Sequence, residues 1–250
     1  MEKLLELKNV SLTYQTPKDE ITAVKDLSFY CGNGDFMSII GPSGCGKTTV
    51  LSLIAGLISP TSGEIRLNGE NNSAKRENLG YMLQKDHLFP WRTIEKNIYL
   101  PLEIKKIKNK SAKENALSLL KKYGLYNFKD NYPDELSGGM RQRAALIRTL
   151  VSDPQLLLLD EPFSALDYQT RLSVCDDVYK IIKSERKTAI LVTHDISEAI
   201  SMSDVIVVLT ARPAKVKSIF LPNIEGNSPI TKRESPQFGV WFEKLWKELN

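Results

Sequence analysis

The sequence has few cysteines, few histidines and no long apolar run. Its three cysteines, Cys31, Cys45 and Cys175, are an odd number at unrelated spacings, which argues against a disulfide framework or a metal site. No stretch reaches the roughly 18 consecutive apolar residues that a membrane-spanning helix needs, and the charged, alternating start is unlike a secretory signal. The net charge of +4 is too small to indicate a nucleic-acid partner. We therefore expect a cytoplasmic protein that does not bind nucleic acid.

The sequence has enough apolar residues for a large core, and its predicted strands and helices alternate regularly. The chain has 250 residues, of which 42% are hydrophobic, so it can fold as one large domain or two closely joined ones. Short apolar runs predict strands at Leu5–Val10, Leu27–Cys31, Phe36–Ile40, Glu64–Leu67, Leu79–Leu83, Leu156–Asp160, Thr188–Thr193, Asp204–Leu209 and Lys215–Phe220. Helices between the later strands indicate a mostly parallel sheet. The helical pattern from Thr93 to Val151 predicts a subdomain inserted into this sheet.

A glycine-rich loop follows the strand Phe36–Ile40 and precedes a predicted helix. Its residues Gly41, Gly46, Lys47 and Thr48 fit the pattern G-x-x-x-x-G-K-[ST]. Glycines let successive N–H groups point at phosphate oxygens, and the helix start adds positive potential. Lys47 would reach the β and γ phosphates, and the Thr48 hydroxyl would bind Mg²⁺. The residues expected at the phosphates are Gly41, Ser43, Gly44, Cys45, Gly46, Lys47, Thr48 and Thr49, with Cys45 contributing its backbone. The alternative is a plain glycine turn.

Two acidic residues end a second buried strand. Four leucines at 156–159 run into Asp160 and Glu161, which places both carboxylates at the carboxyl tip of a strand, where open α/β sheets bind ligands. Asp160 would hold Mg²⁺ in the arrangement typical of phosphate loops. Glu161 lies one residue further along the chain and points elsewhere, towards an attacking water. The alternative is a solvated pair of acids with no catalytic role.

A second anion site is indicated at the start of another helix. Ser137, Gly138 and Gly139 would present a hydroxyl and bare N–H groups in front of the helix dipole. Nothing else in the same chain calls for a second phosphate site. Taken alone, the segment could be an ordinary helix cap. The neighbouring Arg141 and Arg143 are read as surface or structural residues.

The order of these motifs resembles that of the ATP-binding cassette (ABC) ATPases. The segment Leu-Ser-Gly-Gly-Met-Arg-Gln-Arg at 136–143 resembles the family signature, with Met140 in place of the commoner glutamine. The resemblance implies an α/β fold: a P-loop NTPase core with a mostly parallel sheet, an N-terminal antiparallel β-subdomain and an inserted helical subdomain. It implies one ABC ATPase domain over residues 1–250, made of a nucleotide-binding core at 1–86 and 154–220, a helical signature subdomain at 87–153 and a C-terminal helical tail at 221–250.

The resemblance also assigns roles to single residues. Glu161 would polarise the attacking water as the general base, and His194, at the end of the strand Thr188–Thr193, would contact the γ-phosphate and orient that water. Gln84 matches the glutamine that senses Mg²⁺ and the water, so the resemblance implies a catalytic role for it and makes it a third Mg²⁺ ligand beside Thr48 and Asp160. The residues Ser137, Gly138 and Gly139 would bind the ATP held by a second copy, which implies a homodimer.

Two further matches concern the adenine and the dimer interface. Tyr14 resembles the aromatic residue that stacks on adenine, although an aromatic in a short N-terminal strand is often part of the core. The segment Ser164-Ala-Leu-Asp167 matches the D-loop, which crosses the dimer interface in the family. The resemblance implies that each chain of the homodimer binds ATP and Mg²⁺.

One segment indicates a membrane partner. Phe89, Pro90 and Trp91 would be unusual on a free surface, where contiguous bulky apolar groups mark a contact. In transporter ATPases this region receives a helix of the permease. The chain most resembles ATPases that serve uptake of nitrate, sulfonates, taurine and related small anions. We therefore expect integral-membrane permease subunits as partners, a substrate-binding protein as an indirect one, and a position on the inner face of the cell membrane.

Two alternatives to the importer function stay open. One is a non-transport ABC ATPase that acts on ribosomes or DNA, although the second cassette or long coiled-coil insertion usual for that class is not visible. Another is a P-loop kinase, which would have no use for the signature.

The lysine-rich stretch Lys105–Lys113 is read as a solvated loop and helix face. The tail from Trp241 to Leu249 has helical spacing and is read as a helix packed on its own domain.

Overall fold

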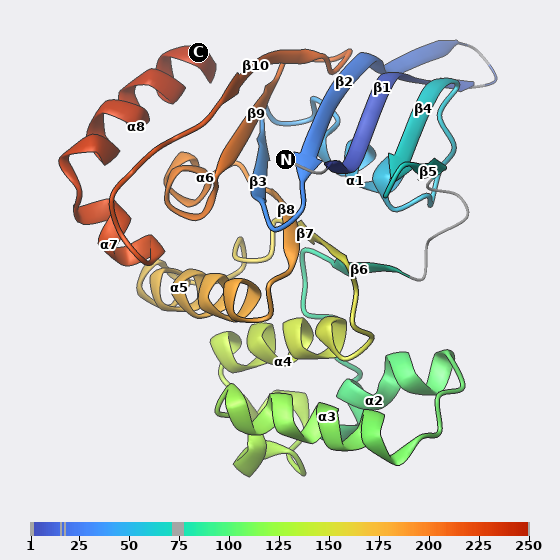
Figure 1. Cartoon of the computed structure of the whole chain (residues 1–250), viewed down its shortest axis with the longest axis vertical. Coiled ribbons are helices and arrows are strands. Elements are labelled where there is room, and N and C mark those ends of the chain that lie inside the picture. Colours follow the sequence, from blue (N-terminus) through green and yellow to red (C-terminus); the bar gives the residue numbers. More distant parts are fainter. Residues whose placement is uncertain (1–2, 16, 18, 72–77, 250) are drawn as a thin grey trace.

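The computed structural model describes residues 3–15, 17, 19–71 and 78–249. They form two β-sheets with helices around them (Figure 1). The first sheet is antiparallel, with the order β2 (Glu20–Gly32), β1 (Lys3–Gln15), β4 (Ser62–Leu67) and β5 (Glu70–Asn71). The second sheet has the order β10 (Val216–Phe220), β9 (Val205–Leu209), β3 (Phe36–Ile40), β8 (Thr188–Val192), β7 (Leu156–Asp160) and β6 (Leu79–Met82).

The second sheet confirms the predicted α/β class. All its neighbouring strands are parallel except β10, which runs antiparallel to β9. Every residue of β3, β7 and β8 is buried, as expected for parallel strands that are covered on both faces and are therefore apolar throughout. A turn at Asn68-Gly69 joins β4 to the antiparallel strand β5.

The first two strands are longer than the sequence predicted. The apolar runs Leu5–Val10 and Leu27–Cys31 cover only part of β1 and β2, which pair as far as Gln15 and Glu20. Polar residues continue the pairing through side-chain bonds across the strands, such as the 2.8 Å bond from Gln15 Nε2 to Glu20 Oε1. Because these polar residues lack an apolar alternation, they look like a loop in the sequence.

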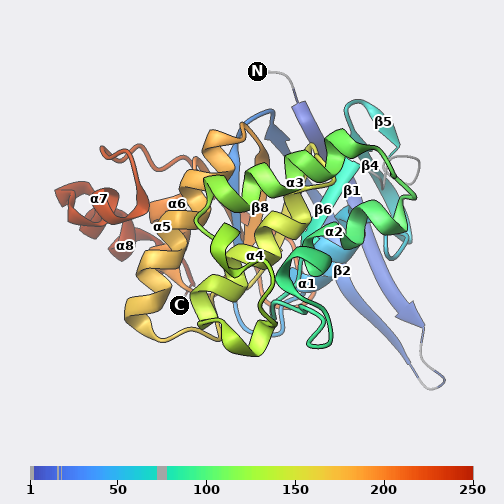
Figure 2. The ribbon, with the colours of Figure 1, turned by 90° about the horizontal axis from the view of Figure 1, so that it is seen from below.

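The helices fall into three groups. Those beside the second sheet are α1 (Lys47–Ile54), α5 (Tyr168–Ser184) and α6 (Ile196–Met202). The segment predicted to be helical contains α2 (Ile94–Ile104), α3 (Lys110–Lys122) and α4 (Gly138–Leu150), with short 3-10 helices at Tyr126–Phe128 and Pro133–Glu135. The tail contains α7 (Pro229–Glu234) and α8 (Pro236–Leu249). Figures 1 and 2 show α2, α3 and α4 together as a layer of their own, with α4 next to the sheet.

The two faces of the second sheet belong to different cores. Leu156 and Leu158 of β7 pack with α1 and the antiparallel sheet. Leu157 and Leu159, which point to the other face, pack with α2, α3, α4 and α5. The helix α1, which follows the glycine loop, and the helix α4, which begins in the signature, therefore cover opposite faces of β7.

The tail packs on its own domain, as predicted. Leu245 of α8 is fully buried in a third core with Ile200 of α6 and Val208 of β9, while Trp241 and Phe242 pack against this core. The three cysteines are free thiols inside the protein. Among the helices of the described residues, none is both long enough and apolar enough to cross a membrane.

Candidate active site

The glycine loop joins the end of β3 to the start of α1. Gly46 is the N-cap of α1 and has a φ of 119°, and Gly44 has a φ of 71°. Both values lie in the region that side-chain-bearing residues rarely adopt. A Cβ at Gly41 would lie 3.0 Å from the backbone oxygen of Leu209, so this glycine also allows close packing against β9. The backbone of the loop can therefore turn sharply into a helix whose first N–H groups are free to bind an anion.

Lys47 lies over this loop. Its side chain is buried, and the Nζ donates to the carbonyl oxygens of Gly41 at 2.9 Å and Pro42 at 3.0 Å. Carbonyl oxygens carry no net charge, so these two bonds supply no counterion for the ammonium. A phosphate group bound by the loop would supply that counterion. The structure thus places the Lys47 ammonium at the loop, and its contact with the β and γ phosphates stays a prediction.

Asp160 meets the same loop from the tip of β7. Thr48 Oγ1 donates to its Oδ1 at 3.3 Å, and the Tyr81 hydroxyl donates to its Oδ2 at 3.4 Å. Burial raises the pKa of the Asp160 carboxyl above its usual 3.8, because a charge removed from water is disfavoured. A cation would offset this cost, and a carboxylate with a hydroxyl is the hard oxygen donor set that Mg²⁺ prefers. Thr48 and Asp160 therefore fit the predicted metal site.

Gln84, the third predicted metal ligand, lies elsewhere in this structure. Its Nε2 donates to the hydroxyl of Ser164 at 3.3 Å, and that hydroxyl donates to the backbone oxygen of Glu161 at 3.0 Å. The side chain is thus attached to the segment predicted to be the D-loop, while the structure shows it no contact with Asp160. Because this bond joins exposed side chains, Gln84 can exchange it for other partners at little cost.

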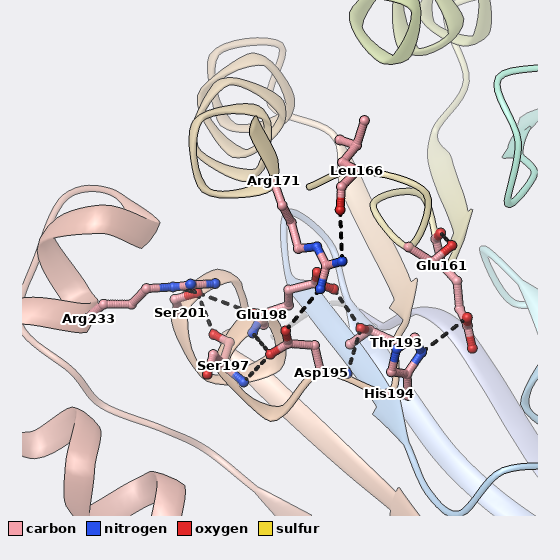
Figure 3. A network of polar contacts seen from close by, with 11 residues as sticks. Glu161, Leu166, Arg171, Thr193, His194, Asp195, Ser197, Glu198, Ser201 and Arg233 are labelled. Carbon is pink, nitrogen blue, oxygen red and sulfur yellow. Dashed lines mark hydrogen bonds and ion pairs between the residues drawn. The ribbon is translucent and has the colours of Figure 1, made fainter. Parts of the chain in front are cut away.

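The predicted base and the predicted histidine lie next to each other. Glu161 follows β7 and His194 follows β8, and the His194 Nδ1 is 3.1 Å from Glu161 Oε2 (Figure 3). Glu161 has a φ of 44°, and its N–H donates to the oxygen of Val192 at 2.9 Å. The His194 side chain is 60% exposed, so water can reach the pair. The predicted partners therefore come together at the sheet edge, beside Asp160.

The signature serine caps its helix. Ser137 is the N-cap of α4, and its hydroxyl accepts from the N–H of Met140 at 3.3 Å. A Cβ at Gly139 would lie 2.8 Å from Val174 Cγ2, and one at Gly138 would lie 3.0 Å from Leu166 Cδ2. The two glycines thus let the helix start approach α5 and the D-loop closely, a packing role that the sequence pattern did not reveal.

Arg141 has the structural role expected for it. Its Nε lies 3.2 Å from Asp86 Oδ2, and its NH1 donates to the oxygen of Leu136 at 2.6 Å. Arg148, further along α4, donates to the backbone oxygens of Asp86 and His87, each at 2.7 Å. The segment that follows Gln84 is therefore fastened to the signature helix.

Of the predicted aromatic contact residues, Tyr14 and Trp91 are exposed and Phe89 is half-buried. Tyr14 is 42% exposed, so it is available for stacking and does not belong to the core. Phe89 and Trp91 stack on each other with ring centroids 4.9 Å apart, and Trp91 is 71% exposed. Asn97 was not predicted as a functional residue; it is fully buried in α2, accepts from the N–H of Phe89 and donates to the oxygen of Phe89. A polar residue amid the apolar positions of a helix was the only available signal.

Comparison with known proteins decides the family. A sequence model of the family described as "ABC transporter" matches residues 24–164. The chain belongs to this family. An alignment of 248 residues, 98% of this chain and 95% of the relative, is 50% identical to YtlC, an uncharacterised ABC transporter ATP-binding protein of Bacillus subtilis. The fold class and the ATPase activity predicted from the sequence are those of this ABC family.

Two named import ATPases are also similar to this ABC chain. It is 38% identical over 240 residues to the aliphatic sulfonates import ATP-binding protein SsuB of Bacillus cereus, covering 96% of this chain and 92% of SsuB. It is 37% identical over 246 residues to the taurine import ATP-binding protein TauB of Roseobacter denitrificans, with the same two coverages. A dimeric structure of the ATP-binding cassette MJ0796, in a post-hydrolysis state bound to ADP and Pi, matches with a TM-score of 0.74 and 31% identity, over 88% of this chain and 99% of that one.

Proposed function

We propose that this chain is the ATPase subunit of a binding-protein-dependent importer for a small anion such as nitrate, a sulfonate or taurine. It acts as a homodimer on the cytoplasmic face of the membrane, attached to integral-membrane permease subunits. The observation that carries the chemical part is the pair Glu161 and His194 at the sheet edge, 3.1 Å apart and next to the buried Asp160. The identity of the cargo is supported by the similarity to SsuB and TauB.

Hydrolysis begins with a nucleotide bound along the glycine loop. Lys47 and the loop N–H groups bind the β and γ phosphates, and Tyr14 stacks on the adenine. Thr48 and Asp160 would hold Mg²⁺, and Gln84 would be its third protein ligand. When bound there, Mg²⁺ neutralises charge on the phosphate oxygens.

Glu161 then acts on the attacking water. A carboxylate oxygen of Glu161 accepts the proton as the water oxygen forms a bond to the γ-phosphorus, and the bond from that phosphorus to the ADP oxygen breaks. His194 lies within hydrogen-bond reach of Glu161 and orients the water or the γ-phosphate. The products are ADP and inorganic phosphate.

The position of the signature supports a dimer. The helix that Ser137 caps covers the face of β7 opposite to α1, so the signature is well placed to serve a different nucleotide from the one on its own loop. In a head-to-tail pair, Ser137, Gly138 and Gly139 of each chain bind the ATP of the other. The dimeric ABC cassette that resembles this chain supports the arrangement.

The permease contact is assigned to Phe89 and Trp91. Two stacked aromatic rings, one of them mostly exposed, form an apolar anchor of the kind that fills a pocket on a partner. Asn97 fixes their loop on α2. The fastening of the segment 86–87 to α4 joins this loop to the signature, so closure of the dimer would move the permease contact as well.

Isolation of the transporter tests this proposal. A tagged Glu161→Gln chain is purified with MgATP from gently solubilised native membranes, and the proteins that accompany it are identified by mass spectrometry. We expect a polytopic permease with Glu161→Gln and much less of it with the matched control Trp91→Ala in the same background. Recovery of ribosomal or DNA-bound proteins without a permease would contradict the transport function and leave the ATPase chemistry intact.

A further inference from the structure

A closed ring of contacts passes through Glu161 and His194. From Glu161 the ring passes to His194 at 3.1 Å, along the chain to Asp195, and from Asp195 Oδ2 to Arg171 NH1 at 3.7 Å. Arg171 NH2 donates to the oxygen of Leu166 at 2.9 Å, and Ser164 on the same turn donates back to the oxygen of Glu161 at 3.0 Å. Figure 3 shows Arg171 between the D-loop and the segment after β8.

The Arg171 side chain links the D-loop, residues 164–167, to the segment that follows β8, residues 193–195. It lies in the first turn of α5, which Asp167 caps by accepting from Thr170 N at 3.0 Å. Its guanidinium reaches back to Leu166 and across to Asp195. A planar fork with several N–H groups can serve two such partners at once, which a single ammonium cannot do as well.

Asp195 links Arg171 to residues 193–195, the segment that contains His194 and is called the histidine segment below. Its Oδ1 caps α6 by accepting from Ser197 N at 2.7 Å and Glu198 N at 3.1 Å, while its own N–H donates to Thr193 Oγ1 at 3.0 Å. Thr193 and Asp195 flank His194 directly. The backbone on either side of the histidine is therefore fixed, and Arg171 ties this fixed segment to the D-loop.

Glu161 needs such support because its backbone is strained. A glutamate with a φ of 44° occupies the left-handed region, which is unfavourable for a residue with a side chain. The surroundings maintain it through the bond from Glu161 N to Val192 O and through the turn in which Ser164 N donates to Glu161 O at 3.2 Å. Leu166, whose oxygen accepts from Arg171, ends the next turn, in which its N–H donates to the oxygen of Phe163 at 3.1 Å.

We propose that Arg171 is a positioning residue for hydrolysis: its guanidinium closes the ring and thereby holds Glu161 and His194 in mutual register. The inference rests on the catalytic roles proposed above for those two residues. Arg171 itself does not touch the nucleotide. Its loss therefore lowers the rate of the chemical step and leaves ATP binding by the glycine loop unchanged.

Steady-state kinetics on the purified full chain test the proposal. Arg171→Met keeps the aliphatic stem and removes the hydrogen bonds, and we expect kcat to fall about tenfold, as for the loss of a charged hydrogen bond, with KM for ATP within about twofold of the parent. Arg171→Lys should recover part of the loss, because it keeps the charge. The matched control is Arg233→Met, which removes a second guanidinium of this region, one that bonds Ser201 and does not touch the D-loop; it should keep the parent kcat.

A double-mutant cycle separates positioning from general damage. Asp195→Asn still caps α6, because asparagine is a good N-cap, but it removes the charge that faces Arg171. If the two residues act through one contact, the double variant should lose no more kcat than Arg171→Met alone. Multiplied losses, a matching fall for Arg233→Met, or a parent kcat for Arg171→Met would each overturn the inference.

The same assay distinguishes failure of the inference from failure of the proposed site. Glu161→Gln is measured beside the other variants. If it hydrolyses ATP at the parent rate, the proposed base is wrong and the ring has no catalytic pair to hold. If it is inactive while Arg171→Met matches the parent, the base stands and only the positioning role is refuted.

Discussion

Glu198 is the most strongly perturbed carboxylate near the histidine segment, and it predicts a pH effect on stability. The residue is 3% exposed in α6, and burial raises its pKa from 4.5 to about 7. Its Oε2 accepts from Thr193 Oγ1 at 2.6 Å, which opposes the shift only in part. The charged groups that act on it are Asp195, which raises the pKa, and Arg171 and Arg233, which lower it.

The magnitude follows from the two pKa values. Between pH 4.5 and 7 the folded chain keeps the Glu198 proton, whereas the unfolded chain has released it. The free energy of unfolding therefore falls as pH rises through this window and is constant, for this residue, above it. A displacement from 4.5 to about 7 corresponds to about 3 kcal/mol, at 1.36 kcal/mol for each pKa unit.

Glu198→Gln should remove this effect. The amide is neutral at every pH, and its oxygen can still accept from Thr193. Between pH 4.5 and pH 8 the free energy of unfolding of the parent should fall by about 3 kcal/mol more than that of the variant, both measured in urea. The control is Glu234→Gln, which removes an exposed carboxylate at the end of α7. A difference between variant and parent that does not change with pH would refute the reasoning.

Three further predictions concern the loop, the signature and the permease contact. Lys47→Ala should weaken ATP binding directly, so an unchanged Kd in a titration would exclude the lysine from the phosphate site. Gly139→Ala places a Cβ 2.8 Å from Val174 Cγ2 and should lower the free energy of unfolding by about 1 to 3 kcal/mol in urea; a parent-like value would mean that α4 shifts freely. Trp91→Ala should leave the unfolding midpoint unchanged, because the ring is 71% exposed, while permease recovery from membranes falls; equal recovery would remove Trp91 from that contact.

The sequence predicted the parts of the site that have short, ordered motifs. The glycine loop and the Asp160–Glu161 pair end buried strands, and their positions followed from the apolar runs before them. The sequence placed Glu161 and His194 each at the end of a strand but did not predict that these strands are neighbours. Their approach depends on the parallel pairing of β7 and β8, because neighbouring parallel strands end at one edge.

Other features depend on tertiary contacts that leave little local signal. Arg171 occupies an ordinary helix position, and its role appears only when the D-loop and Asp195 come near it. Asn97 likewise looks like a misplaced polar residue until its bonds to Phe89 are seen. The polar half of the β1–β2 hairpin was missed because cross-strand pairing, and not apolar alternation, maintains it.

The most direct test of the central claim is the mass of the Glu161→Gln chain in solution, measured by light scattering with and without MgATP. If Glu161 is the base and the signature closes on a second chain's nucleotide, MgATP should convert the chain of 28.2 kDa into a species of twice that mass that does not turn over. Adding Lys47→Ala to the same chain should keep it monomeric. A Glu161→Gln chain that stays monomeric with bound MgATP, or hydrolyses it at the parent rate, would contradict the account.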